Sequence, residues 1–310
     1  MVMAKFYPYL RAKTFDLIAV VHAAPKLVKN GKILPVLEPV RLKTQPLVSR
    51  AALFARAGLP VSLIMNPQVG QLYGTPHVTV QLLADMRATN ATVVPALIVH
   101  TQLQVSEIRQ FQAHIQGGQS IYVHRDAVSG LVLAALQSSP PTENVFVNGG
   151  TSAAYQSSFP TRALLRDGFR AQTKNANYPP LSFFSDLHLT YLSNGYAGFG
   201  DFSITGDAYV ATGGPAYAIA IHMTEDKETH GIFCNHFLST SNLTTANPPG
   251  KFSQAVAALV SYSNAHPGAI DFSNAYAELL QHHNAGTFPG LPDLKRLSIQ
   301  HHLELMTTLV

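Results

Sequence analysis

The chain has 310 residues, of which 46% are hydrophobic and 12% are charged, a composition that excludes a disordered chain and predicts a large buried core. Its formal net charge is +4, but Lys and Arg form no cluster. An anionic ligand is therefore allowed, and direct nucleic-acid binding is disfavoured. The single cysteine, Cys234, excludes an intrachain disulfide and offers no cysteine-based zinc site, and we expect it to be an inert core thiol.

Nothing in the sequence predicts contact with a membrane. No segment approaches the roughly 18 uninterrupted apolar residues of a membrane span. The first residues lack the charged-then-apolar layout of a signal peptide. Together with the single cysteine, these features predict a cytoplasmic protein.

The first half of the chain alternates between short apolar runs and segments of helical periodicity. Strands are predicted at residues 6–11, 32–38, 61–66, 92–100, 120–126 and 144–148. Helices are predicted between them, at residues 14–25, 47–56, 75–86, 106–118 and 127–137, with another through Tyr155. The helix at 127–137 is apolar nearly all round, so we expect it to be heavily covered. This alternation favours a parallel sheet covered by helices.

The alternation becomes less regular after residue 150. A helix is predicted at 163–170, strand-like segments at 181–189, 196–204 and 217–223, and a hairpin partner at 231–239. The seventh and eighth barrel strands are assigned to 198–204 and 217–222. Three helices close the chain, at 252–263, 273–283 and 294–309. The predicted fold class is α/β, a TIM-like (β/α) barrel with an irregular last third, in one domain over 1–310 with 240–310 as a helical part packed on it.

Most predicted strands end at an ionisable or amide side chain, and the carboxyl ends of barrel strands converge on one face. The candidate set is Arg11, Glu38, Asn66, His100, His124, Arg125, Asn148, Asp201 and His222. A carboxylate and an imidazole in an apolar cavity can exchange protons near neutral pH, so the candidate catalytic residues are Glu38, His124, Asp201, His100 and His222. Paired guanidinium hydrogen bonds can hold a phosphate or carboxylate, so the candidate ligand-binding residues are Arg11, Asn66, Arg125 and Asn148. The alternative is that these polar ends cap strands, neutralise one another or face solvent.

Two glycine-rich segments allow a functional and a structural interpretation. Gly149 and Gly150, before a helix, could bind an anion on exposed backbone amides, although a tight turn with a Thr or Ser cap is the more common explanation. The segment Gly195–Gly214 predicts either a flap over the barrel mouth or an ordinary loop. Asp126 is interpreted as a helix N-cap rather than a catalyst.

A divalent metal is an open alternative as cofactor, because the chain has 14 histidines and several suitably placed carboxylates. Asp186 and His188 would alternate on one strand face, and His236 could join them. The sequence contains no two-His helix motif. The pairs at 282–283 and 301–302 are interpreted as surface or interhelix residues, because neighbours on a helix point in different directions.

Six motifs spread over the chain carry a resemblance to a known family. They are Tyr7–Arg11, Leu34–Val40, Asn66–Gly70, Ser185–Leu189, Gly198–Ile204 and Lys295–His302. Together they resemble the bacterial and phage family called beta protein, which is largely uncharacterised. The resemblance implies a mobile-element or anti-phage setting, with a small nuclease-like protein encoded nearby as a partner. It implies no catalytic residues.

Two functional hypotheses follow from these observations. In the first, the barrel mouth acts on a small anionic or phosphorylated substrate, by acid and base hydrolysis of a phosphoester. In the second, the protein is a non-catalytic sensor or scaffold that binds the neighbouring nuclease-like protein. Barrels host many chemistries, so the fold alone does not decide between them.

Overall fold

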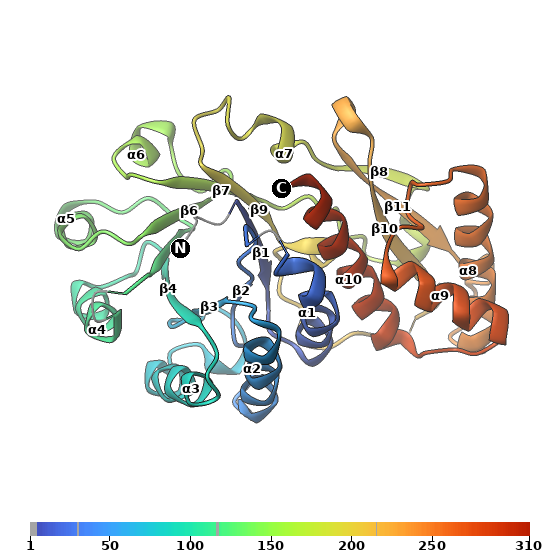
Figure 1. The fold of residues 1–310 in the computed structure, drawn as a ribbon, viewed down its shortest axis with the longest axis horizontal. Coiled ribbons are helices and arrows are strands. Elements are labelled where there is room, and N and C mark those ends of the chain that lie inside the picture. Colours follow the sequence, from blue (N-terminus) through green and yellow to red (C-terminus); the bar gives the residue numbers. More distant parts are fainter. Residues whose placement is uncertain (1–4, 30, 116–117, 215) are drawn as a thin grey trace.

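Eight parallel strands form a closed barrel in the computed structural model, which describes residues 5–29, 31–115, 118–214 and 216–310 (Figure 1). Neighbouring strands follow the order β1-β2-β3-β4-β5-β6-β7-β9, and β9 pairs with β1 to close the ring. Their bounds are β1 Phe6–Leu10, β2 Val36–Leu37, β3 Val61–Ile64, β4 Val93–Val99, β5 Ile121–His124, β6 Glu143–Val147, β7 Arg162–Arg166 and β9 Gly198–Asp201. The predicted TIM-like barrel is confirmed.

Helices follow most strands and cover the outside of the barrel (Figure 1). Their bounds are α1 Thr14–Leu27, α2 Gln45–Ala57, α3 Pro76–Ala88, α4 Val105–Ile115, α5 Gly130–Ser138 and α6 Ala153–Ser157. α1 continues through Pro25, where an interruption was predicted. Burial of Leu17, Val20 and Leu27 against the barrel outweighs the hydrogen bond that a proline removes in the last turn.

Along each barrel strand, successive side chains point alternately into the barrel and outward toward the helices. Tyr9 on β1 and Val123 on β5 belong to the apolar cluster inside the barrel. Their neighbours Leu10 and Tyr122 belong to the larger cluster between the barrel and its helices. A residue that comes directly after an outward-facing one, such as Arg11 after Leu10, therefore faces inward again. This alternation decides which of the polar strand ends reach the barrel mouth.

A second, antiparallel sheet lies beside the barrel (Figure 1). We call it the accessory sheet; its strands are β8 Leu181–Ser185, β10 Ala220–Asp226 and β11 Ile232–Leu238, in the order β10-β11-β8. The remaining α-helices are α7 Leu187–Thr190, α8 Pro248–Ala265, α9 Asn274–Ala285 and α10 Leu291–Leu309. α8 packs on the accessory sheet, and α10 lies between that sheet and α1. Short 3-10 turns occur at Gly70–Leu72, Asn175–Asn177, Ser203–Thr205 and Glu228–His230.

Two barrel-strand assignments from the sequence are wrong. The segment predicted as a helix at 163–170 instead contributes to β7. Its five residues, RALLR, are too few for the spacing of apolar residues to distinguish a strand from a helical turn. The strand predicted at 217–222 as part of the barrel instead begins at Ala220 and pairs antiparallel with β11. The predicted hairpin between these last two strands is confirmed.

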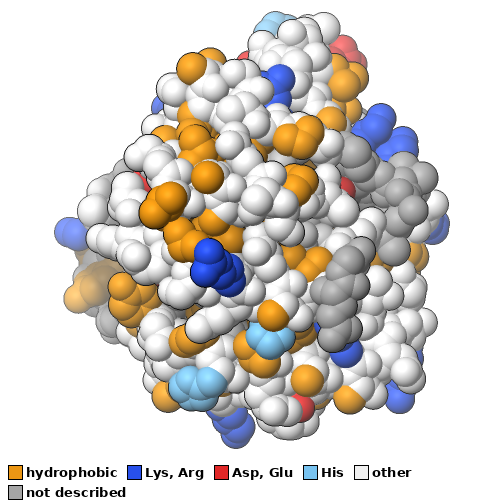
Figure 2. Space-filling model, turned by 90° about the vertical axis from the view of Figure 1, so that its left-hand side faces the viewer, with side chains coloured by type: hydrophobic (Ala, Val, Ile, Leu, Met, Phe, Trp, Pro, Cys, Tyr) orange, Lys and Arg blue, Asp and Glu red, His pale blue; other side chains and the backbone are white. Residues whose placement is uncertain are grey.

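The helix α5 is less covered than its apolar sequence predicted. Within it Leu136 alone is fully buried, and Leu131 is 81% exposed. Figure 2 views the side of the molecule on which α4, α5 and α6 lie and shows hydrophobic side chains spread over it, with few acidic ones. In the part of the chain that the structure describes, no helix is both long and apolar enough to cross a membrane.

Candidate functional site

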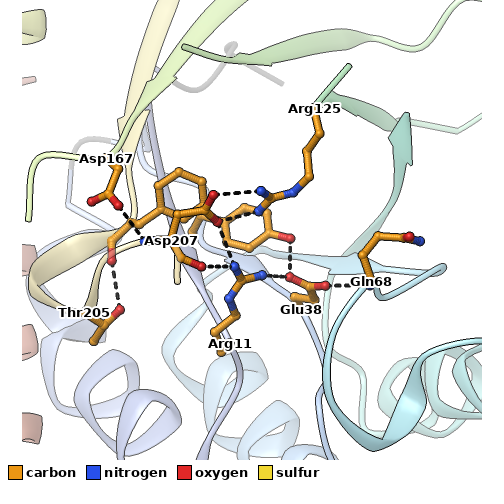
Figure 3. A network of polar contacts seen from close by, with 9 residues as sticks. Arg11, Glu38, Gln68, Arg125, Asp167, Thr205 and Asp207 are labelled. Carbon is orange, nitrogen blue, oxygen red and sulfur yellow. Dashed lines mark hydrogen bonds and ion pairs between the residues drawn. The ribbon is translucent and has the colours of Figure 1, made fainter. Parts of the chain in front are cut away.

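Three of the predicted strand-end residues converge at the carboxyl end of the barrel: Arg11, Glu38 and Arg125 (Figure 3). Each follows its strand at a position that the two-residue period turns inward, two residues beyond Tyr9, Val36 and Val123 of the interior cluster. The strand ends of a parallel barrel meet on this face, where barrel enzymes place their sites. We call this group, with Asp207, the mouth cluster.

Glu38 is completely buried and accepts three kinds of donor. The Tyr9 hydroxyl donates to Oε2 at 2.6 Å, the Arg11 guanidinium donates to the same oxygen, and the Gln68 backbone N–H donates to Oε1 at 2.8 Å. Burial and the adjacent Glu38 charge raise the pKa of Tyr9 well above its usual value, so its hydroxyl remains a donor. Glu38 is therefore fixed as a carboxylate acceptor that orients Arg11.

Asp207 completes the cluster, although it belongs to the loop between β9 and β10 (Figure 3). Arg125 donates to both of its carboxylate oxygens, Nη1 to Oδ2 at 2.8 Å and Nη2 to Oδ1 at 2.6 Å. Arg11 Nη2 donates to Oδ1 at 2.7 Å and also to the Asp207 carbonyl. One carboxylate thus lies between two guanidinium groups, in the forked geometry by which Arg binds carboxylate and phosphate ligands.

The electrostatics of the cluster match this geometry. Burial raises the pKa of Asp207, but the hydrogen bonds and charge of Arg125, together with Arg11, outweigh it and leave the pKa below its usual value. Two guanidinium groups face two carboxylates, so the cluster is neutral as it stands. Arg11 Nε is buried and has no hydrogen-bond partner among the described residues. Arg11 therefore keeps one donor that its present partners do not use.

The loop that carries Asp207 lies over the barrel mouth. The Asp207 backbone N–H donates to Asp167 Oδ2 at 2.9 Å, which ties the loop to the end of β7. Lys13, after β1, donates to the Val210 carbonyl, and its ammonium lies 4.9 Å from the centre of the Tyr209 ring. Of the glycine-rich segment 195–214, the part at 198–201 is the barrel strand β9, and the part around residues 207–210 covers the mouth. Whether it moves as a flap stays a prediction.

Aromatic rings form the floor under the guanidinium groups. The Arg125 guanidinium carbon lies 5.7 Å from the Tyr9 ring centre and 5.5 Å from that of Phe202, and the Arg11 carbon lies 5.3 Å from Tyr9. Both rings belong to the interior cluster of the barrel. Cation–π contacts and close packing limit how the two guanidinium groups can turn.

A pocket of about 190 Å³ adjoins the cluster through Gln68. Its walls come from the loops after β3 and β4 and include Asn66, His100, Glu107 and the exposed ring of Tyr73. Burial lowers the pKa of His100, so its imidazole is neutral at neutral pH and can accept a proton. Asn66 plays a structural part, because its side-chain amide exchanges two hydrogen bonds with the backbone of Ile98 and extends the sheet beyond β3.

The predicted placement of His124 at the mouth is wrong. His124 points outward, stacks on Phe146 at 4.4 Å between ring centres, and hydrogen bonds to Asn144 Oδ1 at 3.0 Å and the Tyr155 hydroxyl at 3.1 Å. Burial lowers its pKa to about 4. The residue follows outward-facing Tyr122 by two positions, so the strand period turns it away from the neighbouring Arg125.

Asp201, His222 and Asn148 are also absent from the mouth cluster. Asp201 points outward and accepts hydrogen bonds from the Ser203 backbone and from His302 Nε2 on α10. His222 lies on the accessory sheet. Asn148 is exposed after β6, where its backbone N–H donates to the Leu165 carbonyl.

Gly149 and Gly150 have a structural explanation in the turn after β6. Gly149 has a φ of +85°, and a Cβ on Gly150 would lie 1.9 Å from the Arg125 carbonyl oxygen. Glycine at 150 therefore lets this turn pack directly against the residue that holds Asp207. Ser152 then caps α6 by accepting from the Tyr155 backbone, while Asp126 caps no helix, because α5 begins later with Ser129 as its N-cap.

The predicted metal candidates do not form one group. Asp186 pairs with Arg166, and His188 lies in α7 rather than on a strand, 3.4 Å from Asp226. Among the described residues, one group of three His, Cys, Asp or Glu side chains has all its potential ligand atoms within 4.8 Å of one another. It consists of His222, Cys234 and His236. Burial lowers the pKa of His236 to about 4. Burial and the neighbouring His236 lower that of His222 to about 3.

Asp207, Tyr9 and Gln68 were missed as site residues. Tyr9 carries a sequence signal, because it shares the inward face of β1 with Arg11 two positions later. Asp207 carries none, since its loop position lies 196 residues from Arg11 and no strand pattern fixes it. His301 and His302, expected at the surface or between helices, are fully buried, where α10 meets Thr224 on the accessory sheet.

No family model and no curated protein matches the chain. One solved structure, described as a putative dihydrodipicolinate synthase family protein from Coccidioides immitis, is 10% identical with a TM-score of 0.40 and covers 64% of this chain and 66% of its own. A second, oxaloacetate acetylhydrolase in complex with oxalate, is 11% identical with a TM-score of 0.31 and covers 48% and 57%. At these values the two structures support no inference about the activity of this chain.

Proposed function

We propose that the barrel mouth binds the carboxylate or phosphate group of a small ligand in the position that Asp207 occupies. The observation that carries this proposal is the carboxylate of Asp207 held by both Arg125 and Arg11. Asp207 is a loop residue, whereas both arginines follow barrel strands, so the loop can withdraw while the arginines stay. Without Asp207, two guanidinium groups would face the single carboxylate of Glu38, and the excess positive charge would attract an anion.

The pocket beside Gln68 would hold the rest of the ligand. It adjoins the mouth cluster and offers the neutral imidazole of His100 together with the carboxylate of Glu107. Of the proton handlers predicted from the sequence, His100 and Glu38 lie on this face of the barrel. Acid and base hydrolysis of a phosphoester, in a mobile-element or anti-phage module, remains our prediction for the reaction, with His100 as the proton acceptor.

Calorimetric titration with inorganic phosphate and with citrate tests the binding step. We expect Asp207→Ala to bind at least one of these anions about 10-fold more tightly than the unchanged protein, because the internal competitor is gone. Arg125→Ala in that background should abolish the gain. Asp186→Ala is the matched control, since it removes a carboxylate from an Arg pair outside the cluster. Equal and negligible binding of both anions by all variants would contradict the proposal.

A second candidate function is binding of a protein partner. The outward side of α5 favours it, because Leu131 is 81% exposed on a face with few acidic side chains (Figure 2). Figure 2 shows further hydrophobic side chains over the same face, and a contiguous exposed apolar area often marks an interaction surface. Co-purification with the small nuclease-like protein that the family resemblance implies as a neighbour tests this function. Leu131→Glu should weaken the association, and no association at micromolar concentration would count against it.

A further inference from the structure

Three potential metal ligands share one face of the accessory sheet. Cys234 and His236 are two residues apart on β11, so their side chains point to the same side. His222 on β10 is the direct cross-strand partner of His236. Cross-strand and two-residue neighbours are the closest same-face positions in an antiparallel sheet. The fold therefore gathers two imidazoles and one thiol without help from any loop.

The distances fit a tetrahedral ion after a small adjustment. The Nδ1 atoms of His222 and His236 lie 2.7 Å apart, and Cys234 Sγ lies 3.9 Å from the Nδ1 of His236. Around zinc, with bonds of about 2.0 Å to nitrogen and about 2.3 Å to sulfur, the corresponding separations are about 3.3 Å and about 3.5 Å. Each of these two pairs must therefore move by well under 1 Å, which side-chain rotation supplies, and the ligand atoms of His222 and Cys234 already lie within 4.8 Å of each other.

Ser182 on β8 sets the imidazole of His236 in the form that a metal requires. Its hydroxyl lies 2.8 Å from Nε2 of His236. If Nε2–H donates to this hydroxyl, Nδ1 carries a lone pair and faces the other two ligands. The contact between the two Nδ1 atoms then needs a hydrogen on Nδ1 of His222. With a metal ion bound at that atom, the neutral ring would carry its hydrogen on Nε2 instead, and the Cys234 thiol would release its proton to solvent. A partner on the second ring nitrogen is usual for metal-bound histidines.

Aromatic rings enclose one side of the group, and a pocket opens on another. Tyr178 stacks on His236 at 4.7 Å between ring centres, and Phe169 meets His222 edge-on at 5.1 Å. A cavity of about 400 Å³ is lined by His222, Phe169 and Tyr178. Three protein ligands beside an open cavity leave a fourth position for water or an exogenous ligand, as in catalytic zinc sites.

We propose that His222, Cys234 and His236 bind one zinc ion, with the fourth position open to the adjacent cavity. Thiolate and imidazole are the ligands that zinc prefers, and Ser182 acts as a positioning residue for His236. This proposal replaces the expectation that Cys234 is an inert thiol. It is independent of anion binding at the barrel mouth, because the two sites share no ligand residue.

Cobalt substitution of the full-length protein, prepared free of metal, tests the proposal directly. We expect one Co²⁺ per chain, with visible bands of tetrahedral geometry and a near-ultraviolet thiolate-to-cobalt band. Cys234 is the single cysteine of the sequence, so such a band can come from no other residue. Zinc should displace the cobalt and remove both signals. A cobalt spectrum of octahedral form without the thiolate band would overturn the proposal, even if no variant folds.

Zinc affinities of variants, measured by competition with a chelator, test the roles of single residues. We expect Cys234→Ser and His236→Gln to weaken zinc binding by at least about 100-fold, and Ser182→Ala to weaken it by about 10- to 100-fold. Ser182→Thr, which keeps the hydroxyl, should restore binding. His282→Gln on the exposed end of α9 is the matched control and should change nothing. Unchanged affinity in Cys234→Ser, with circular dichroism showing an intact fold, would overturn the proposal.

Discussion

At the barrel mouth, Arg11 and Arg125 are held by two carboxylates, and every charge has an opposite charge in contact. On the accessory sheet, burial lowers the pKa values of His222 and His236 and raises that of Cys234, so all three are neutral at neutral pH. Nδ1 of His236 contacts both of the others inside an aromatic shell. The difference teaches how each region can accept a ligand. Under our proposals, the mouth would take a ligand in exchange for Asp207, whereas the sheet would take a metal ion in the space between neutral donors. Substitutions in the two regions should therefore lower the free energy of unfolding by unequal amounts.

The largest expected effect is the difference in unfolding free energy between a substitution at the barrel mouth and one on the accessory sheet. Glu38→Ala leaves Arg11 without its fully buried partner, and we expect it to lower the free energy of unfolding by about 3–5 kcal/mol. Cys234→Ala in the metal-free protein removes one buried sulfur atom and no charge, so its cost should be about 1 kcal/mol. Urea unfolding of both variants measures this difference. Equal costs would mean that charge compensation does not distinguish the mouth from the sheet.

A smaller effect tests whether the two-pronged contact of Arg125 with Asp207 stabilises the fold beyond its charge. Arg125→Lys keeps the charge but cannot span both Asp207 oxygens, so we expect a loss of about 1–2 kcal/mol in unfolding free energy. Arg166→Lys is the matched control, because its contact with Asp186 is single and more exposed. Its cost should stay within about 0.5 kcal/mol. A similar cost for both variants would show that the fork adds nothing to a point charge.

The smallest expected effect is a pH-dependent difference between two forms of the mouth cluster, in which the titration of the sheet histidines, common to both forms, cancels. The folded pKa of Asp207 lies below its usual value of 3.8, because Arg125 and Arg11 outweigh the opposing effect of burial. Its ion pairs therefore stabilise the fold fully above about pH 3.8, and this contribution is lost as the pH falls through the lower folded pKa. Urea midpoints of the unchanged protein and Asp207→Asn should converge below pH 3.8. A gap that stays constant with pH would contradict this prediction.

The barrel could be predicted from the sequence because its strands are apolar runs separated by helical segments of ordinary length. The seventh strand could not, because Arg162–Arg166 is too short for periodicity to tell a strand from a helical turn. In the candidate site, Arg11, Glu38 and Arg125 could be found as polar strand ends. His124 could not be excluded until the inward face of its strand was known, although the two-residue period already separated it from Arg125. Asp207 depends on the path of a loop, which no local pattern fixes.

The accessory sheet is built from two separate excursions of the chain out of the barrel. β8 leaves after β7 and returns as β9, and β10 and β11 leave after β9 and return as α10 beside α1. Ile299, Leu303 and Met306 of α10 are buried in the same apolar cluster as Leu17 and Val20 of α1. A single deletion from β8 to β11 would also remove the barrel strand β9. A truncation before β10 would leave β8 in place and take α10 away, which would expose the apolar surface of α1 to water. The sheet therefore cannot be removed in one piece without damage to the barrel.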